Sequence, residues 1–273
     1  MIGTRTTAGG EGVAQVATPR RPRLPVAIPI AIAVAWGLTF AAQLSGWSVL
    51  LHHDMLIESD AIPLWLALIV FLVAWQSMIV AMMLPSSLPM IRLFAVTSVR
   101  QERPGEAMAA FLGGYAVVWT LFAGVSFLGD AGLHHLVDRT PWLAQHPQVI
   151  GGGVLALAGL FQFTDLKERC LTECRHPGAF LLTRYRRGTA AAFRIGRAHG
   201  LFCLGCCWAL MLLMFAVGVA HLWWMAALTA LMVYEKVGRN GRRATPVAGV
   251  LLLALSAAVF LQFPAWVPHL LAH

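Results

Sequence analysis

The chain has 273 residues, of which 59% are hydrophobic and only 12% are charged, and its formal net charge is +8. Soluble domains carry roughly 25% charged residues, so this composition excludes an ordinary soluble protein and indicates a polytopic membrane protein. The basic stretches are short and lack a nucleic-acid-binding motif, so the expected partner of the positive charge is the lipid bilayer and not nucleic acid.

The chain divides into a polar tail and one membrane domain. Residues 1–24 are rich in Gly, Thr, Arg and Pro, which predicts a disordered basic cytoplasmic tail. Residues 25–273 form apolar runs near the 20 residues that a spanning helix needs, which predicts a single all-α transmembrane helix bundle. Seven spans are predicted in chain order, at 25–45, 62–84, 107–128, 149–165, 200–220, 222–237 and 247–264.

The second predicted span ends in a segment that contains two prolines, Met82-Met83-Leu-Pro85-Ser86-Ser87-Leu-Pro89-Met90. Prolines four residues apart remove backbone donors, so we expect the helix to break there. The thioethers of Met82 and Met83 are candidate ligands that would select Cu(I) over Zn(II). Packing in the apolar core is the alternative role for both methionines.

The distribution of basic residues predicts the orientation. The largest connection, 165–199, is basic, and its segments 178–187 and 189–198 could form interfacial helices. With a cytoplasmic N-terminus and seven spans, every lysine and arginine except Arg139 falls in an inner segment or at its edge. This pattern predicts a multi-pass protein of a prokaryotic inner (plasma) membrane with its C-terminus outside.

All five cysteines lie beside that basic connection. In the run His199-Gly-Leu-Phe-Cys203-Leu-Gly-Cys206-Cys207-Trp, the imidazole and the thiols share one face of a helix. A pair of cysteines one helical turn apart, followed by a histidine, lies upstream. Sulfur and imidazole donors together are typical of a Cu(I) or Zn(II) site, and a cytoplasmic position would keep the thiols reduced. The predicted ligands are Cys170, Cys174, His176, His199, Cys203, Cys206 and Cys207.

Further candidate ligands lie deeper in the membrane and outside it. Met214 continues the cysteine-bearing face, which would suit passage of a soft ion, with chance as the alternative. Histidines of the outer loops could collect Cu(II) or Zn(II), or could simply be solvated. These outer candidates are His52, His53, His134 and His135.

Several of these motifs together resemble a known family. They are Met82-Met83-Leu-Pro85, Cys170-x-x-x-Cys174-Arg175-x-Pro177, His199-Gly200-x-x-Cys203-x-Gly205-Cys206-Cys207-Trp208 and Glu235-Lys236. The family is that of the predicted metal-binding integral membrane proteins, the domain-of-unknown-function family 2182. The resemblance covers most of residues 62–240 and implies a multi-span metal-binding membrane protein. It fixes neither the metal nor the activity.

Three functions fit these patterns. The first is a protein that binds copper, or secondly zinc, at the cytoplasmic membrane edge and either transports the ion or delivers it to a membrane or periplasmic metalloenzyme. The second is a membrane metallo-oxidoreductase or a subunit of one. The third is a structural or assembly subunit whose cysteines only pack. The sequence contains no nucleophile elbow, phosphate loop or haem motif that would favour an enzyme, and it leaves the oligomeric state open.

Overall fold

The structure is a computed structural model that describes residues 25–45, 63–217 and 221–261. Every regular element in these ranges is an α-helix, which confirms the all-α prediction. The helices are α1 (Ala27–Leu44), α3 (Leu64–Ser98), α4 (Pro104–Arg139), α5 (Pro141–Ala144), α6 (Pro147–Phe161), α7 (Asp165–Arg175), α8 (Pro177–Arg184), α9 (Thr189–Val217), α10 (Leu222–Val237) and α11 (Gly241–Leu261). The predicted tail lies outside the described residues.

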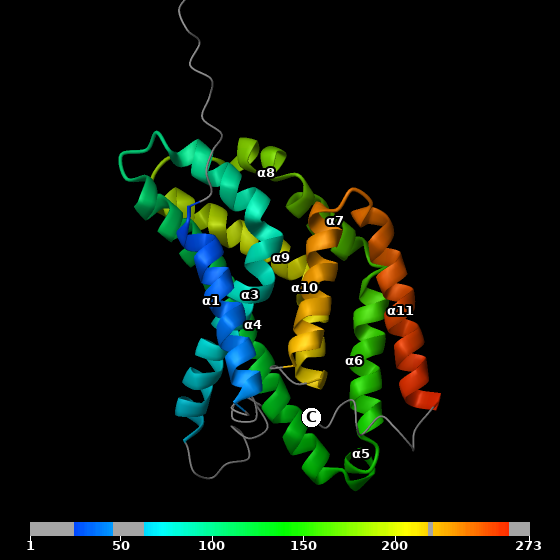
Figure 1. Cartoon of the computed structure of the whole chain (residues 1–273). Helices are drawn as coiled ribbons and strands as arrows, with labels where there is room; N and C mark the ends of the chain where they lie inside the picture. The colour runs from blue at the N-terminus through cyan, green and yellow to red at the C-terminus, as the bar shows by residue number, and fades with distance from the viewer. Residues whose placement is uncertain (1–24, 46–62, 218–220, 262–273) are drawn as a thin grey trace, which may run out of the picture.

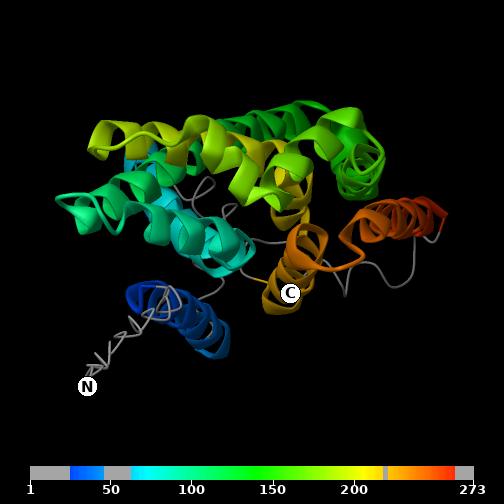
Figure 2. The same ribbon diagram turned by 90° about the horizontal axis from the view of Figure 1, so that it is seen from above.

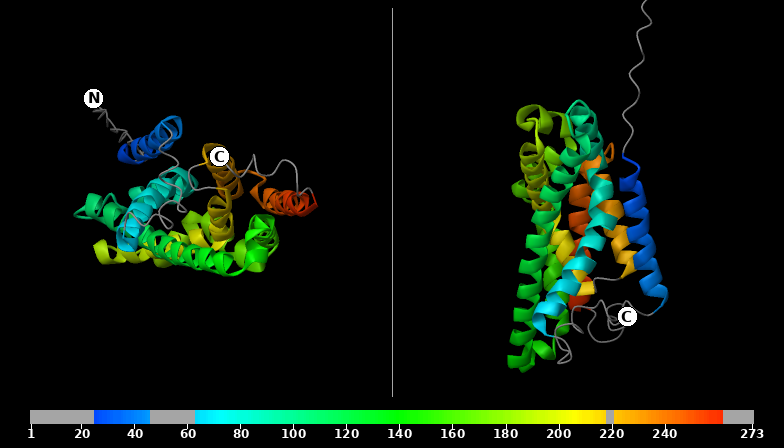
Figure 3. Two further views of the ribbon diagram at one scale, coloured as in Figure 1. Left: turned by 90° about the horizontal axis from the view of Figure 1, so that it is seen from below. Right: turned by 90° about the vertical axis from the view of Figure 1, so that its left-hand side faces the viewer.

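The long helices run side by side as a bundle (Figures 1 and 3). Five of them, α1, α3, α4, α9 and α11, are long and apolar enough to cross a membrane. A sixth span results if α6 and α7, which meet at a bend of 64°, are counted as one. α10 has 16 residues and falls short of the usual spanning length. Large apolar side chains cover the outer faces of the bundle, as a lipid-facing surface requires.

α3 is continuous through Pro85 and Pro89, so the expected break is wrong. Pro85 has no N–H to donate to the carbonyl of Ala81, one turn earlier. The indole Nε1 of Trp36, on α1, donates to that carbonyl instead, at 3.0 Å. The hydroxyl of Ser86 also donates to a carbonyl of the preceding turn, at 2.8 Å. The hydrogen bond from Trp36 replaces the one that Pro85 cannot make, which helps the helix to continue across this proline.

α9 joins the predicted interfacial segment 189–198 and the following span into one helix. It packs closely on α4 through glycines. A Cβ atom on Gly114 of α4 would meet the backbone carbonyl of Phe193, and one on Gly196 of α9 would meet the backbone carbonyl of Phe111. The two backbones therefore approach as closely as small residues permit, and α9 is held in a fixed position along α4.

The two ends of the bundle differ in charge. The basic connections lie at one end, where α7, α8, the turn between α3 and α4 and the turn between α10 and α11 gather (Figure 1). Seen from above, α1 and α11 stand at opposite edges of the bundle (Figure 2). α1 packs on α3 and α11 packs on α6, while α9 contacts α4, α6 and α7. The centre of the bundle near its basic end is therefore formed by α3, α4, α7, α9 and α10.

Candidate metal centre

One face of α9 carries the central donors of the predicted site. His199, Cys203, Cys206 and Cys207 are exposed by only 3%, 0%, 1% and 1%, respectively. Their common burial follows from the helical spacing of the run, since positions three, four, seven and eight residues apart lie on one side of a helix. That side of α9 turns towards α3, α4, α7 and α10.

The sulfur atoms come together in one place. Sγ of Cys206 lies 3.6 Å from Sγ of Cys207, which lies 3.9 Å from Sδ of Met83 on α3. The thiols of Cys174, on α7, and Cys203 lie close enough to Cys206 to interact with it electrostatically. We call Met83, Cys174, Cys203, Cys206 and Cys207 the sulfur cluster. Two sulfurs bound to one ion at about 2.3 Å would lie about 3.8 Å apart, so these separations are compatible with shared coordination.

The side chains of the sulfur cluster lie close together, but their sulfur atoms do not all point towards one common position. Among the described residues, no group of three or more His, Cys, Asp or Glu side chains has the arrangement of a metal site. The thiols of Cys206 and Cys207 are turned towards the carbonyl oxygen of Cys203, at 3.1 and 2.6 Å. A change of side-chain rotamer would release both hydrogen bonds and redirect the sulfurs.

Cys203 has a polar environment of its own. Nζ of Lys236, on α10, donates to Sγ of Cys203 at 3.1 Å and to the hydroxyl of Ser86 at 2.9 Å. The hydroxyl of Tyr115, on α4, lies 3.2 Å from the same sulfur. A positive charge and a hydroxyl next to this sulfur stabilise negative charge on it.

His199 is linked to Cys203 through two hydroxyl groups. Its Nε2 lies 3.2 Å from the hydroxyl of Ser87, which donates to the hydroxyl of Tyr115 at 3.4 Å. The imidazole also stacks on the Tyr115 ring, with centroids 5.6 Å apart, and meets the ring of Phe180 edge-on. These contacts of the imidazole are with a hydroxyl group and with aromatic rings, and its role as a metal ligand stays a prediction.

Sequence reasoning did not find Tyr115, Ser86, Ser87 or Lys236 as parts of the site. The signal for Lys236 was a charged pair, Glu235-Lys236, at the end of an otherwise apolar helix. The signal for the serines was their position between two prolines and beside candidate methionine ligands. No sequence pattern indicated Tyr115, because it lies 88 positions before the cysteine that its hydroxyl contacts.

A buried ion pair fixes α7 beside the sulfur cluster. Nζ of Lys167 lies 2.8 Å from a carboxylate oxygen of Glu235, and the two side chains are 0% and 2% exposed. The guanidinium of Arg175 donates to the backbone carbonyl of Glu235 at 2.8 Å. From the same buried face of α7, the thiol of Cys170 packs against Gly205 of α9, where a larger residue would collide with it. These contacts bring the two cysteine groups of the sequence together.

Other predicted ligands lie apart from these contacts. His176 ends α7 and is exposed, and its ring nitrogen contacts the carbonyl of Thr172 at 2.9 Å. Met82 and Met214 are fully buried. His134 contacts the carbonyl of Asp130 near the far end of α4, next to the exposed His135. His52 and His53 lie outside the described residues.

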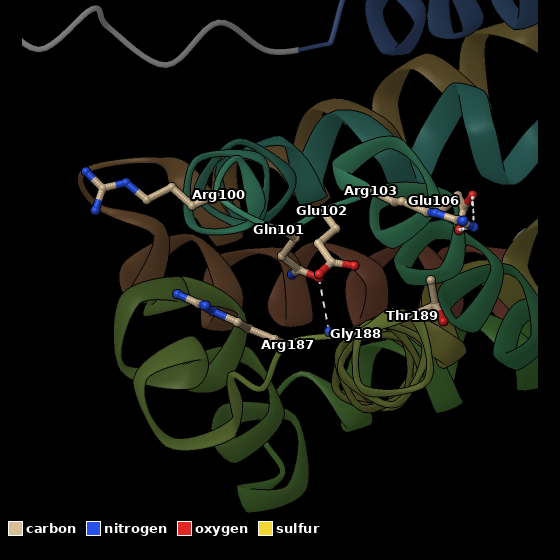
Figure 4. A pocket seen from close by; sticks show the side chains of 8 residues that line it. All are labelled: Arg100, Gln101, Glu102, Arg103, Glu106, Arg187, Gly188 and Thr189. Carbon is tan, nitrogen blue, oxygen red and sulfur yellow. Dashed lines mark hydrogen bonds and ion pairs between the residues drawn. The ribbon is translucent and has the colours of Figure 1, made fainter.

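A hollow of about 460 Å³ opens at the basic end, between the α3–α4 turn and the start of α9. Gln101 joins its two sides, because its side-chain oxygen accepts a hydrogen bond from the backbone N–H of Gly188 at 3.0 Å (Figure 4). Arg100 and Arg187 extend away from the hollow, and Arg103 pairs with Glu106 (Figure 4). The guanidinium groups therefore do not converge on a common point there.

These observations define a class of protein: a helical protein with membrane-length apolar helices and a buried sulfur cluster near its basic end. Comparison with known families then places it. A family model, PpoB2, described as copper chaperone, matches residues 72–259. The match covers more than half of the chain, so the chain belongs to this copper chaperone family. No curated protein and no solved structure gives a match. The copper link agrees with the favoured metal, while the resemblance to family 2182 stays a prediction.

Proposed function

We propose that this protein is an integral membrane copper chaperone that binds Cu(I) at the sulfur cluster and delivers it to a membrane or periplasmic metalloenzyme. The observation that carries the proposal is the contact between the sulfurs of Cys206, Cys207 and Met83 in one buried place. The buried thiols of Cys174 and Cys203 lie close enough to Cys206 to interact with it electrostatically. Membership of the copper chaperone family supports the choice of metal.

The chemistry of the donors fits monovalent copper. Thiolate and thioether sulfurs are soft ligands that favour Cu(I), and a thioether such as that of Met83 is a poor ligand for Zn(II). We propose Cys174, Cys203, Cys206 and Cys207, with Met83, as the ligands. Zinc is the second choice of metal.

The proposed orientation places this site near the cytoplasmic face. In it, α1, α3, α4, α6 with α7, α9, α10 and α11 cross a prokaryotic inner membrane, which gives seven spans, a cytoplasmic N-terminus and an outer C-terminus. Support comes from the basic connections gathered at one end of the bundle, since lysines and arginines are retained on the cytoplasmic side. The ion would then load at the inner edge of the membrane.

The direct test is the metal content of the full chain, purified anaerobically in detergent after growth with copper and measured by mass spectrometry. We expect near-stoichiometric copper in the wild type and its loss when Cys203, Cys206 and Cys207 are changed together to serine. The matched control is Met225→Leu, which removes a buried sulfur lining a hollow between α1, α3 and α10.

The control should retain its copper. Copper that survives the triple substitution would contradict the proposed ligands. A wild-type protein that stays free of copper and zinc after reconstitution with Cu(I) would contradict the function and favour a structural subunit.

A further inference from the structure

A lysine side chain is buried beside the proposed copper ligands. Lys236 lies in the last turn of α10 and is only 7% exposed. The hydrogen bonds of its ammonium group go to the hydroxyl of Ser86 at 2.9 Å and to the sulfur of Cys203 at 3.1 Å. Burying an ammonium group is costly unless it is paired, so this position calls for nearby negative charge.

The carboxylate next to it in sequence does not supply that charge. The buried lysines and carboxylates of the described residues are Lys167, Glu235 and Lys236. Glu235 pairs with Lys167 at 2.8 Å. Lys167 and Glu235 together carry no net charge, which leaves one positive charge on Lys236. The hydrogen-bond partners of the Lys236 ammonium group come from α3 and α9, and of these two only the sulfur of Cys203 can carry a compensating negative charge.

We propose that Lys236 makes the sulfur cluster select a monovalent ion over a divalent one, an inference that rests on the proposed copper function. For any given set of thiolate ligands, the Cu(I) complex carries one more negative charge than the Zn(II) complex. A fixed positive charge 3.1 Å from one ligand therefore stabilises the Cu(I) complex more than the Zn(II) complex. This holds for two, three or four thiolates, because the difference between the two ions is always one charge.

The effect should be large because the charge is buried. One unit of charge acting over roughly 4 Å through a protein interior gives a discrimination of about 100-fold or more. Softness of the sulfur ligands already favours copper, and Lys236 adds an electrostatic preference that softness alone does not supply.

The test compares four forms of the full chain in detergent: wild type, Lys236→Met, Lys236→Arg and Arg239→Met. Arg239 lies three positions further along, is exposed, and controls for the loss of one positive charge near the same end of the molecule. The affinities for Cu(I) and for Zn(II) are measured by competition with chelators of known affinity. The quantity to compare is the ratio of the Cu(I) affinity to the Zn(II) affinity of each variant. A general loss of stability would weaken the binding of both ions and would not favour one of them.

We expect Lys236→Met to lower the Cu(I)-to-Zn(II) affinity ratio by about 100-fold. Lys236→Arg keeps the charge and should stay within a few-fold of the wild type, as should Arg239→Met. An unchanged ratio in Lys236→Met, while the wild type binds Cu(I), overturns the inference and leaves the copper function standing. A wild type that binds no Cu(I) overturns the function itself.

If Lys236→Met does not fold, Lys236→Gln removes the charge and keeps a hydrogen-bond donor. A second measurement uses the wild type alone with Ag(I) and Cd(II), two soft ions that differ by one charge. Stronger retention of Ag(I), with the preference reduced in Lys236→Gln, supports the inference. Equal retention of the two ions by the wild type overturns it.

Discussion

Cys203 differs from the other cysteines of α9 in the contacts of its sulfur. The thiols of Cys206 and Cys207 donate to a carbonyl of their own helix. The sulfur of Cys203 instead meets an ammonium group from α10 and a hydroxyl from α4. Residues from three helices therefore meet at one atom, so the position and charge of this sulfur depend on the tertiary structure.

Tyr115→Phe tests the contribution of the hydroxyl. The ring and its packing remain, but Cys203 and Ser87 each lose a hydrogen-bond partner. One such bond near a charged group is worth about 1–2 kcal/mol, so the Cu(I) affinity should fall by about tenfold. Competition titration measures the change.

Tyr234→Phe is the matched control, because Tyr234 is half exposed on α10. It should bind Cu(I) as the wild type does. An equal loss in both variants would mean that the Tyr115 hydroxyl has no particular role at the site.

At the scale of elements, the contact between α4 and α9 positions the site. Gly114 lies next to Tyr115, and its backbone touches that of α9. A side chain at this position would push the two helices apart. The hydroxyl of Tyr115 would then move away from Cys203, so helix packing would be coupled to the proposed metal binding.

Two adjacent glycines allow a sharp test of that contact. A Cβ on Gly114 collides with the backbone of Phe193, whereas a Cβ on Gly113 meets nothing within 4 Å. Gly114→Ala should destabilise the fold by about 1–3 kcal/mol, because overpacking forces the backbones apart. Gly113→Ala should be neutral or stabilising by up to about 1 kcal/mol, because alanine is the better helix former.

Thermal unfolding in detergent, followed by tryptophan fluorescence, measures both changes. The expected fall in Tm for Gly114→Ala is roughly 5 °C. Equal Tm values for the two variants would show that the close approach contributes nothing to stability.

α3 shows where sequence reasoning about elements reaches its limit. The rule that prolines end helices rests on the lost donor and on local crowding. The partner that compensates for Pro85 is Trp36, 45 positions before the carbonyl that it contacts. No local pattern indicates such a partner. For α9, in contrast, the sequence correctly predicts that the cysteines share one face of a helix, because helical periodicity alone places them together.

At the scale of the whole molecule, the charges distinguish the two ends of the bundle. The basic end carries α7, α8 and the connections beside the sulfur cluster (Figure 1). α4 ends at the other end with Arg139, the single basic residue expected outside. The distribution predicts which end faces the cytoplasm, because positively charged loops resist translocation.

Reporter fusions test this orientation. Alkaline phosphatase joined after residue 273 should be active and a green fluorescent reporter there should be dark, because the C-terminus is expected outside. Truncation after Gly238, at the basic end, should reverse both signals. Activity of the phosphatase at both junctions would contradict the seven-span orientation.

The class of the molecule and the grouping of its cysteines could be predicted from composition and spacing, but the completed site could not. Lys236 contacts Cys203 because α10 turns back along α9, a packing result that depends on all the helices together. The sequence likewise offered no means to decide whether Cys174 reaches Cys206. The buried pair of Lys167 with Glu235 fixes α7 against α10, which helps to place Cys174 near Cys206.

The burial of the sulfurs bears on how fast an ion could enter or leave the sulfur cluster. Every cysteine is less than a tenth exposed, and α7, which carries two of them, packs against α8 and α9. α7 is held by Lys167 and Arg175, and Arg184 of α8 pairs with Glu173 of α7 at 3.3 Å. An ion that moves between the sulfurs and the basic end has to pass these short helices, so their motion would set its residence time together with the strength of its bonds. A copper carrier built in this way would keep its ion in the presence of a stronger competitor simply because exchange is slow.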